Sequence, residues 1–461
     1  MVFNSAQFLL FLPLAALGYF AVPQRARRPW LLLACYFFYF CWNPAHVPVL
    51  AFVTAVGYLG GRLLEGKPRK GVLAAGILLA LAPLIGFKYL GFLTKSVLSV
   101  LVHLGVQIAP PAFDFLLPMG ISFYTLQTVG YLVDTYRGEK AEHNLLDFAL
   151  FVGFFPQMVS GPISRGNRLL PQLSAAKRPA FDDLRDGVLL LIWGYFLNIV
   201  VADRAALFVA AVYAPESEYE GWFYIVATLL FCLQLYGDFG GCSVMAMGTA
   251  KILGIDLIDN FNAPYFSQSI AEFWRRWHIS LSSWFRDYVY IPLGGNRTKK
   301  WRWVLNLLIV WALTGFWHGA QWNFLLWGLY YGVLLLAEKL FFGKLLARLP
   351  KLVRWLCTAF FLLVGWVLFN MTDFAALGHT LKMMFVPHAT NWRAAAAADV
   401  SLLSSMVYLP LGMICCLPLL PKERSSSRYL LVSNLAALAL LAVCIVYILS
   451  SSYNPFIYFR F

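Results

Sequence analysis

The stretch from Gly71 to Phe87, GVLAAGILLALAPLIGF, contains no charged or amide side chain. A helix needs about 20 mainly apolar residues to cross the hydrocarbon core of a bilayer, and this run approaches that length. Comparable runs recur along the chain, at Ala6–Val22, Val188–Val201, Trp222–Leu235, Leu352–Phe369 and Tyr429–Leu449. The short alternating segments of a membrane β-barrel are absent from the sequence. The runs therefore predict an all-α polytopic integral membrane protein with roughly eleven spans.

The overall composition supports this class. The 461 residues are 61% hydrophobic and 13% charged, whereas soluble domains are about 45–50% apolar and about 25% charged. The formal net charge is +14, but the basic residues are dispersed over membrane boundaries. A nucleic-acid-binding domain would concentrate them on one face, so we expect membrane lipids as partners and no nucleic acid. The 8 cysteines lack metal-ligand spacing, so neither a metal site nor a disulfide framework is expected.

The positions of the basic clusters predict the orientation of the chain. Lys and Arg are enriched in cytoplasmic loops. Here they gather at Gln24–Arg28, Arg62–Lys70, Arg165–Arg185, Arg275–Arg302, Lys339–Arg354 and Lys422–Arg428. The acidic loop Glu216–Glu220 lies between two spans, on the side that these clusters avoid. We therefore expect the N-terminus outside, and because the first basic patch follows the first apolar run, no cleavable signal peptide.

The segment Phe273–Arg297, FWRRWHISLSSWFRDYVYIPLGGNR, departs from the apolar pattern. At about 100° per residue, its aromatic and apolar side chains fall on one helical face, with arginines elsewhere and His278 at the edge. That face comprises Trp274, Trp277, Leu281, Trp284, Phe285 and Tyr288. The pattern predicts one helix lying in the cytoplasmic interface, ended by Pro292 and the glycines after it. An interfacial anchor alone would explain it.

A second histidine lies in the apolar segment Trp311–Asn323, WALTGFWHGAQWN. Ionisable groups within membrane spans are costly and usually mark a functional cavity, although a neutral His318 bonded to a backbone carbonyl is the structural alternative. Histidine is also the natural general base near neutral pH. His278 and His318 therefore form a candidate active site. Asp238, an acid in another apolar stretch, should need a cavity or a partner. The breakers in Gly153–Pro162 predict a re-entrant or buried irregular segment.

These two histidine segments resemble the signature motifs of the membrane-bound O-acyltransferase (MBOAT) family, particularly its bacterial members that O-acetylate alginate. LPMGISFYTLQTVGYLVDTYRG, at Leu117–Gly138, and FFPQMVSGPISR, at Phe154–Arg165, match as well, so the resemblance covers essentially the whole chain. It implies a single membrane domain, residues 1–461, in which 271–323 carries the interfacial helix and both motifs. The implied fold is a ring of tilted helices with re-entrant and interfacial helices around a central funnel.

The resemblance also implies a reaction and its residues. It implies catalytic roles for His318 and His278, and an acetyl group taken from acetyl-CoA or another acyl thioester, with no permanently bound cofactor. Residues that match or flank the motifs are expected to bind substrate: Trp274, Arg275, Arg276, Trp277, Arg286, Trp317, Asn323 and Asp238. For the arginines, guanidinium groups suit phosphate oxygens, while positioning at the membrane boundary is the alternative. Trp317, Asn323 or His278 would stabilise the oxyanion.

The expected setting is the bacterial cytoplasmic membrane, with multiple passes. The acceptor would be an extracytoplasmic polysaccharide, such as an alginate-like exopolysaccharide, reached through an SGNH-type acetyltransferase partner. The stretch Tyr236–Gly248 departs from the family pattern, because Gly237 and Cys242 replace aromatics and Val244 replaces a second carboxylate. Two alternatives remain: D-alanyl transfer from a carrier protein towards teichoic acid, and a non-catalytic transporter or scaffold.

Overall fold

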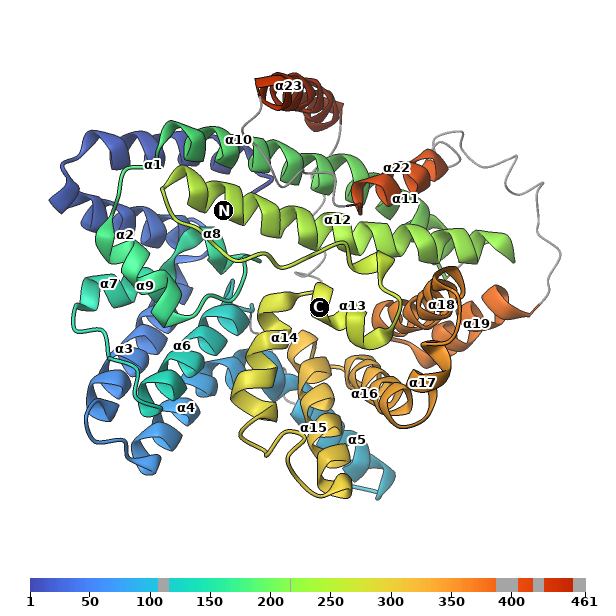
Figure 1. Ribbon diagram of the computed structural model, residues 1–461. Helices are drawn as coiled ribbons and strands as arrows, with labels where there is room; N and C mark the ends of the chain where they lie inside the picture. The colour runs from blue at the N-terminus through green and yellow to red at the C-terminus, as the bar shows by residue number, and fades with distance from the viewer. Residues whose placement is uncertain (107–115, 216, 387–404, 418–426, 451–461) are drawn as a thin grey trace. The chain divides into compact units, whose positions relative to one another are not determined.

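The computed structural model describes residues 1–106, 116–215, 217–386, 405–417 and 427–450 (Figure 1). Across these ranges every regular element is helical and no strand occurs, which confirms the all-α prediction. The chain divides into two compact units. The first comprises Met1–Val188 and Ala246–Ile258, and the second comprises Leu189–Met245 and Asp259–Phe461. Glu216 and most of the basic cluster 422–428 lie outside the described residues.

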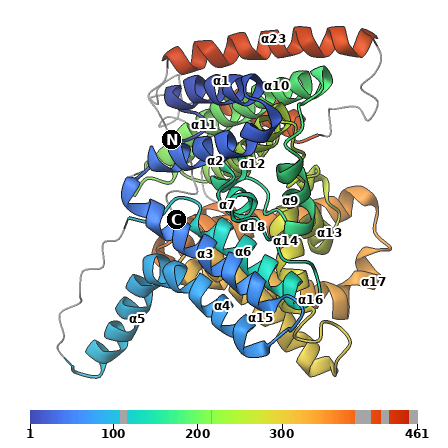
Figure 2. The ribbon, with the colours of Figure 1, turned by 90° about the vertical axis from the view of Figure 1, so that its left-hand side faces the viewer.

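The first unit is built around α3, α4 and α6, which pack side by side (Figure 2). Its main elements are α1 (Ala6–Ala21), α2 (Gln24–Phe40), α3 (Val47–Leu64), α4 (Lys70–Leu84), α5 (Leu90–His103), α6 (Ile121–Tyr136), α7 (Leu145–Gly153), α8 (Phe155–Met158) and α9 (Gly166–Ala175). Glycines on α3 allow the close approach: a β-carbon at Gly57 would lie 2.7 Å from Thr128, and one at Gly60 would lie 2.7 Å from Leu132. Small residues let apolar helices pack at short distance where a bilayer supplies no hydrophobic drive between them.

The predicted irregular segment is present in this unit. Helix α7 ends at Gly153, the single turn α8 follows, and extended backbone leads into α9 at Gly166. Its residues are almost all buried, and Gln157 donates its side-chain amide to the Phe151 carbonyl at 3.0 Å. Side-chain amides of this kind satisfy backbone groups that a broken helix leaves open. The prediction of a buried irregular segment is therefore confirmed.

The second unit contains the two histidine segments. Its main elements are α11 (Asp203–Val212), most of α12 (Trp222–Ile252), α13 (Ile270–Arg276), α14 (Ile279–Phe285), α15 (Lys300–His318), α16 (Trp322–Ala337), α17 (Gly343–Leu346), α18 (Lys351–Asn370), α19 (Phe374–Phe385), α22 (Tyr408–Cys415) and α23 (Ser427–Ser450). Helices α15 and α16 form an antiparallel hairpin (Figure 1). Helix α10 (Phe181–Tyr195) and α12 each contribute residues to both units.

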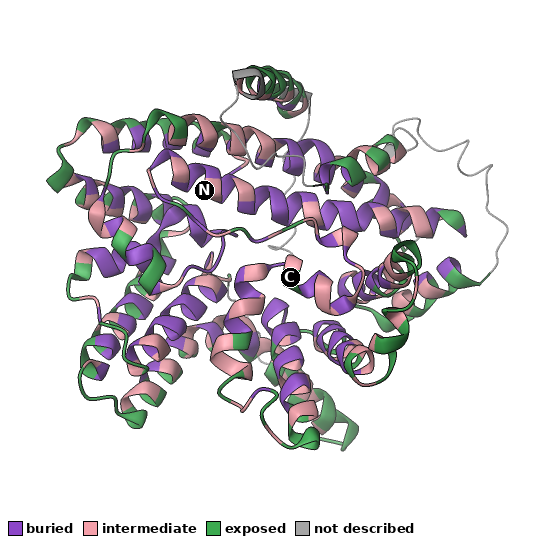
Figure 3. Ribbon diagram, in the orientation of Figure 1, coloured by how far each residue is buried: buried purple, intermediate pink, exposed green. Residues whose placement is uncertain are grey.

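Seven helices among the described residues are long and apolar enough to cross a membrane. They are Pro44–Leu64, Lys70–His103, Phe181–Val212, Trp222–Ile252, Trp322–Leu346, Lys351–Asn370 and Leu430–Ile448. The span on α12 is 78% buried within the protein, as Figure 3 shows along most of that helix. The span on α23 is only 11% buried, as suits a lipid-facing helix. The chain is thus a polytopic membrane protein, and roughly eleven spans in a ring remain a prediction.

Candidate active site

The segment predicted as one interfacial helix is broken at its histidine. Helix α13 ends at Arg276 and α14 begins at Ile279, and His278 between them has a φ of +46°. Asn260 stabilises the break, because its carbonyl accepts from the Ile279 N–H at 3.0 Å and its side-chain oxygen accepts from the Ser280 N–H at 3.2 Å. The prediction of a single helix was wrong, because helical periodicity does not report these contacts from a distant loop.

The start of α13 is held by two carboxylates and a hydroxyl. Ser269 accepts from the Glu272 N–H at 3.0 Å, and Glu272 accepts from the Gln268 N–H at 2.8 Å. Glu338, which follows α16, accepts from the Ile270 N–H at 2.8 Å. Acceptors at a helix N-terminus satisfy open N–H groups and complement the helix dipole. These bonds fix α13 against the end of α16.

His278 is 1% exposed, and both ring nitrogens are buried without a hydrogen-bond partner. Its ring centroid lies 4.7 Å from that of Phe239 and 5.8 Å from that of Trp317. Burial lowers the pKa of the imidazole to about 3, because an apolar environment disfavours the charged form. His278 is therefore a neutral group held in an uncommon backbone conformation, and such strain is concentrated at functional sites.

His318 is the last residue of α15 and is 5% exposed. Its ring lies among those of Trp317, Trp327 and Phe369, at centroid distances of 4.9, 5.0 and 5.5 Å. Gly319 ends the helix, and a β-carbon there would lie 2.2 Å from the Phe324 ring. Because the Trp317 ring contacts both His278 and His318, it connects the two histidines across the site.

One cavity of about 300 Å³ brings both histidines together. Its lining includes Leu307, Val310, Trp311, Thr314 and His318 from one face of α15. Leu307 and His318 are separated by about 16 Å along a helix axis at the usual rise per residue. The cavity is therefore elongated along α15.

The two ends of the cavity differ in chemistry. His278 and His318 are buried at one end. Lys339 marks the other end, because it lies over the ring of Trp303, in the first turns of α15, at 5.8 Å. Tyr290, also in the lining, accepts a hydrogen bond from the Trp303 indole at 3.0 Å. The cavity thus runs from a cationic, exposed end to a buried end with two imidazoles.

Five of the residues predicted for the site line this cavity: Trp274, Arg275, His278, Arg286 and His318. The other five lie elsewhere in the same unit. Trp277 packs against Phe273, Phe261 and Trp366.

The remaining four have other surroundings. Arg276 pairs with Glu272 at 2.6 Å, and Asp238 accepts from the Asn198 amide at 2.6 Å, which is the partner expected for it. Asn323 donates to the Phe369 carbonyl at 3.1 Å. Trp317 touches both histidine rings without lining the cavity. Their roles in substrate binding remain predictions.

Lys339 lines the cavity, although the sequence pattern did not indicate it as a site residue. Lys339 begins a basic cluster that follows an apolar run, and the enrichment of Lys and Arg in cytoplasmic loops was sufficient to explain that cluster. Only the antiparallel packing of α15 and α16 brings it to the cavity, and a β-carbon at Gly332 would lie 3.1 Å from Trp311 as part of that packing. Lys339 follows α16, and in the folded hairpin it lies beside the start of α15. The sequence of either helix alone does not reveal this proximity.

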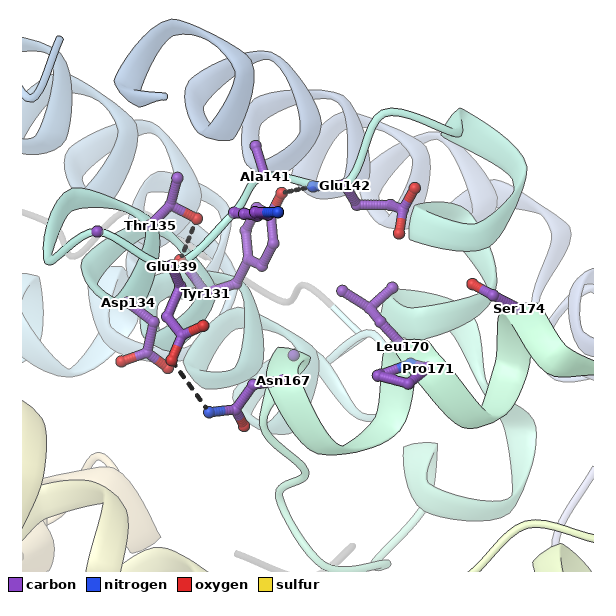
Figure 4. Close-up of a pocket in the computed structure, with 13 residues that line it drawn as sticks. Tyr131, Asp134, Thr135, Glu139, Ala141, Glu142, Asn167, Leu170, Pro171 and Ser174 are labelled. Carbon is purple, nitrogen blue, oxygen red and sulfur yellow. Dashed lines mark hydrogen bonds between the residues drawn. The ribbon is translucent and has the colours of Figure 1, made fainter. Parts of the chain in front are cut away.

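A second cavity, of about 550 Å³, lies in the first unit between α6, the loop after it, and α9 (Figure 4). Asp134, Glu139 and Glu142 are in its lining. The Asn167 amide donates to Glu139 at 3.4 Å, and the Tyr131 hydroxyl accepts from a backbone N–H at 2.8 Å. None of the predicted site residues lines it, so the cavity with the histidines is the candidate active site.

Comparisons with known proteins show the family of the chain. The model of the membrane-bound O-acyltransferase family matches residues 132–378, a range that contains both histidines. The chain is 36% identical over 393 residues to the probable alginate O-acetylase AlgI of Pseudomonas aeruginosa, covering 84% of this chain and 75% of the relative. It is 31% identical over 523 residues to the peptidoglycan O-acetyltransferase of Helicobacter pylori, covering 100% of this chain and 98% of the relative.

A third relative matches a shorter part of the chain. The teichoic acid D-alanyltransferase of Bacillus subtilis is 31% identical over 249 residues, covering 50% of this chain and 61% of the relative. The family match spans more than half of the chain and includes the cavity with two histidines. The chain therefore belongs to the membrane-bound O-acyltransferase family and is a polytopic membrane acyltransferase.

Proposed function

We propose that this chain transfers an acetyl group from a phosphorylated thioester, acetyl-CoA, for O-acetylation of an extracytoplasmic polysaccharide. The observation that carries the proposal is one cavity lined by two buried histidines and by exposed cations. The two acetyltransferase relatives match 84% and 100% of this chain, whereas the D-alanyltransferase matches 50%. Acetyl transfer is therefore favoured over D-alanyl transfer.

In the proposed reaction His318 acts as general base. It takes the proton of an acceptor hydroxyl while the hydroxyl oxygen forms a bond to the acetyl carbonyl carbon. The tetrahedral intermediate then breaks its carbon–sulfur bond, and the protonated His318 returns the proton to the leaving thiolate. The products are an acetyl ester and a free thiol, and His318 is neutral again.

His278 stabilises the oxyanion of the intermediate in this scheme. It is neutral, lines the cavity, and has two ring nitrogens without a protein partner. An N–H held in a dry site interacts strongly with developing negative charge. Asn323 is less suited, because its amide already donates to the Phe369 carbonyl. The acceptor hydroxyl in this scheme belongs to an SGNH-type partner. A polysaccharide hydroxyl then attacks the resulting acetyl ester, the polysaccharide becomes acetylated, and the partner's hydroxyl is released with its proton.

The role of His318 is tested in cells that lack the native gene and carry wild type, His318→Ala or His318→Gln. Loss of a general base costs about 10²- to 10⁴-fold in rate. The readout is the acetate that mild alkali releases from the envelope polysaccharide. With both variants this acetate should therefore fall below detection, although each variant is present in the membrane at the same abundance as wild type. Gln keeps hydrogen bonding but is not a useful proton acceptor. Near-normal acetylation with His318→Gln would make the histidine structural and overturn the mechanism.

A further inference from the structure

The cations of the cavity are not equivalent. Arg286 is already bound to Asp287 through two nitrogens, at 2.7 and 3.1 Å. Arg276 is paired with Glu272 and does not line the cavity. Within the described part of the chain, no carboxylate forms an ion pair with Arg275 or Lys339. Both line the cavity and both are exposed. These two cations are therefore available to an anionic ligand.

The position of Lys339 is fixed by its neighbour. Glu338 accepts from the Ile270 and Ala271 N–H groups, at 2.8 and 3.4 Å. This bond ties the residue before Lys339 to the first turn of α13, the helix that carries Arg275 one turn later. The Lys339 ammonium rests over the Trp303 ring, a contact that orients the charge without neutralising it. The protein thus places two unpaired cations on the wall of one cavity.

The length of the cavity agrees with the length of the pantetheine arm of a thioester donor. This arm has about 13 bonds between its sulfur and its first phosphorus. If each bond adds as much length as a bond of an extended polypeptide backbone, the arm is about 15 Å long. The lining residues of α15 extend from His318 to Leu307, about 16 Å along the helix axis, and Lys339 lies beyond them, over the ring of Trp303. A thioester beside the histidines therefore brings the phosphate of the same molecule to the Leu307 end of the cavity, which is the end nearer Lys339.

We propose that Arg275 and Lys339 bind the phosphate at the end of the donor's pantetheine arm, with Lys339 as a donor-binding residue outside both histidine motifs. This inference rests on the proposed function, because it assumes a thioester donor. The phosphate has two possible sources, the diphosphate of coenzyme A and the phosphodiester that links the arm to a carrier protein. Both present the same chemistry to the two cations.

The experiment measures acetyl transfer by the full chain in inverted membrane vesicles from cells that make the partner protein and the acceptor polysaccharide. Three donors are compared: acetyl-CoA, acetyl-carrier protein and acetyl-pantetheine, which has no phosphate. Lys339→Met should raise KM for the phosphorylated donor about tenfold, the value of one charge-assisted hydrogen bond. The kcat should change little, and acetyl-pantetheine should be used as by wild type. Lys339→Arg should restore KM. Whichever phosphorylated donor wild type uses better identifies the source.

Lys344→Met is the matched control, because Lys344 is also exposed and follows the same helix but does not line the cavity. It should leave KM unchanged. An unaltered KM in Lys339→Met, or an equal loss with acetyl-pantetheine, would overturn the inference while leaving the proposed function intact. Absence of transfer from all three donors by wild type would instead reject the proposed function. Binding of coenzyme A, measured by calorimetry in detergent, should weaken about tenfold in Lys339→Met but not in Lys344→Met.

Discussion

Two features of His278 each carry a free-energy cost in the folded state, and a residue with only a structural role would have neither. Its φ of +46° lies in the left-handed region, which disfavours side chains with a β-carbon by roughly 1–2 kcal/mol. Both ring nitrogens are buried without a partner, and an unsatisfied buried polar group costs about 1–3 kcal/mol. A residue selected only for packing would avoid both costs. The cavity beside it supplies the reason, because a ligand there can provide the missing hydrogen bond.

The low pKa of His278 predicts a specific pH dependence of stability. In the folded protein the pKa is about 3, whereas in the unfolded chain it is about 6.5. Between these values the unfolded state binds a proton that the folded state does not, so lowering the pH favours unfolding. From pH 6.5 to pH 5 the free energy of unfolding should fall by about 2 kcal/mol through this residue.

His278→Asn is the appropriate comparison, because Asn tolerates positive φ and does not titrate. Thermal unfolding in detergent, followed at both pH values, should show a smaller loss of stability in the variant than in wild type. Measuring the difference between the two proteins removes the contribution of other histidines. Parallel pH profiles would show that His278 is solvated and titrates normally.

At the scale of elements, the α15–α16 hairpin sets the dimensions of the site. A β-carbon at Gly315 would lie 2.2 Å from the Phe324 carbonyl oxygen, and one at Gly328 would lie 2.2 Å from the Trp311 carbonyl oxygen. The two backbones are therefore in contact, and no side chain separates them. Trp327 directly precedes Gly328, and His318 follows Gly315 by three residues on α15, so the hairpin cannot adjust here without moving the imidazole.

Gly328→Ala should accordingly damage both stability and activity. The added methyl group must push α16 away from α15, and overpacking of this kind typically costs about 1–3 kcal/mol. We expect a lower thermal midpoint and a large loss of kcat, because His318 and its Trp327 neighbour move apart. Gly378→Ala is the control, since a β-carbon at that position in α19 meets nothing within 4 Å. Full activity in Gly328→Ala would show that the hairpin is more pliable than its spacing indicates.

The elements also show what sequence alone can predict. The apolar runs predicted the helices, and two motifs predicted that His278 and His318 belong to the site. The break at His278 was not predictable, because Asn260 stabilises it from a loop that precedes α13. The same limit applies to Lys339, which reaches the cavity only through antiparallel helix packing. Local patterns report periodicity, whereas both features depend on residues distant in sequence.

At the scale of the molecule, the basic segments of the first unit gather in one place. Arg28 pairs with Asp147 at 2.8 Å, and the Ser174 hydroxyl donates to the same carboxylate at 3.1 Å. His143 pairs with Glu65 at 2.7 Å. These contacts join the start of α2, the residue after α3, α7 with the loop before it, and α9. Segments that carry three of the predicted cytoplasmic clusters thus meet, as expected if they share one side of the membrane.

We expect the acidic loop on the opposite side of the membrane, because helix α12 separates it from the basic segments. Lys251, in the last turn of α12, pairs with Asp183 at 3.0 Å and with Asp256 at 2.9 Å. Gln172 of α9 in turn accepts from the Asp256 N–H at 2.8 Å, which links this end of α12 to the basic segments. Helix α12 has 31 residues, about 46 Å at the usual rise, enough to cross a bilayer. Its other end follows the loop that contains Glu218.

Labelling of single cysteines should therefore place Glu218 and Lys67 on opposite sides. Both residues are exposed, and of the native cysteines only Cys41 is exposed and Cys357 partly so. A background with these two replaced by serine keeps the buried thiols and remains unreactive, because a membrane-impermeant maleimide needs an accessible thiolate.

In intact spheroplasts Glu218→Cys should react at once, while Lys67→Cys should react only after permeabilisation. The opposite result would invert the predicted orientation of the chain. Reaction of both cysteines from the same side would contradict the assignment of α12 as a span.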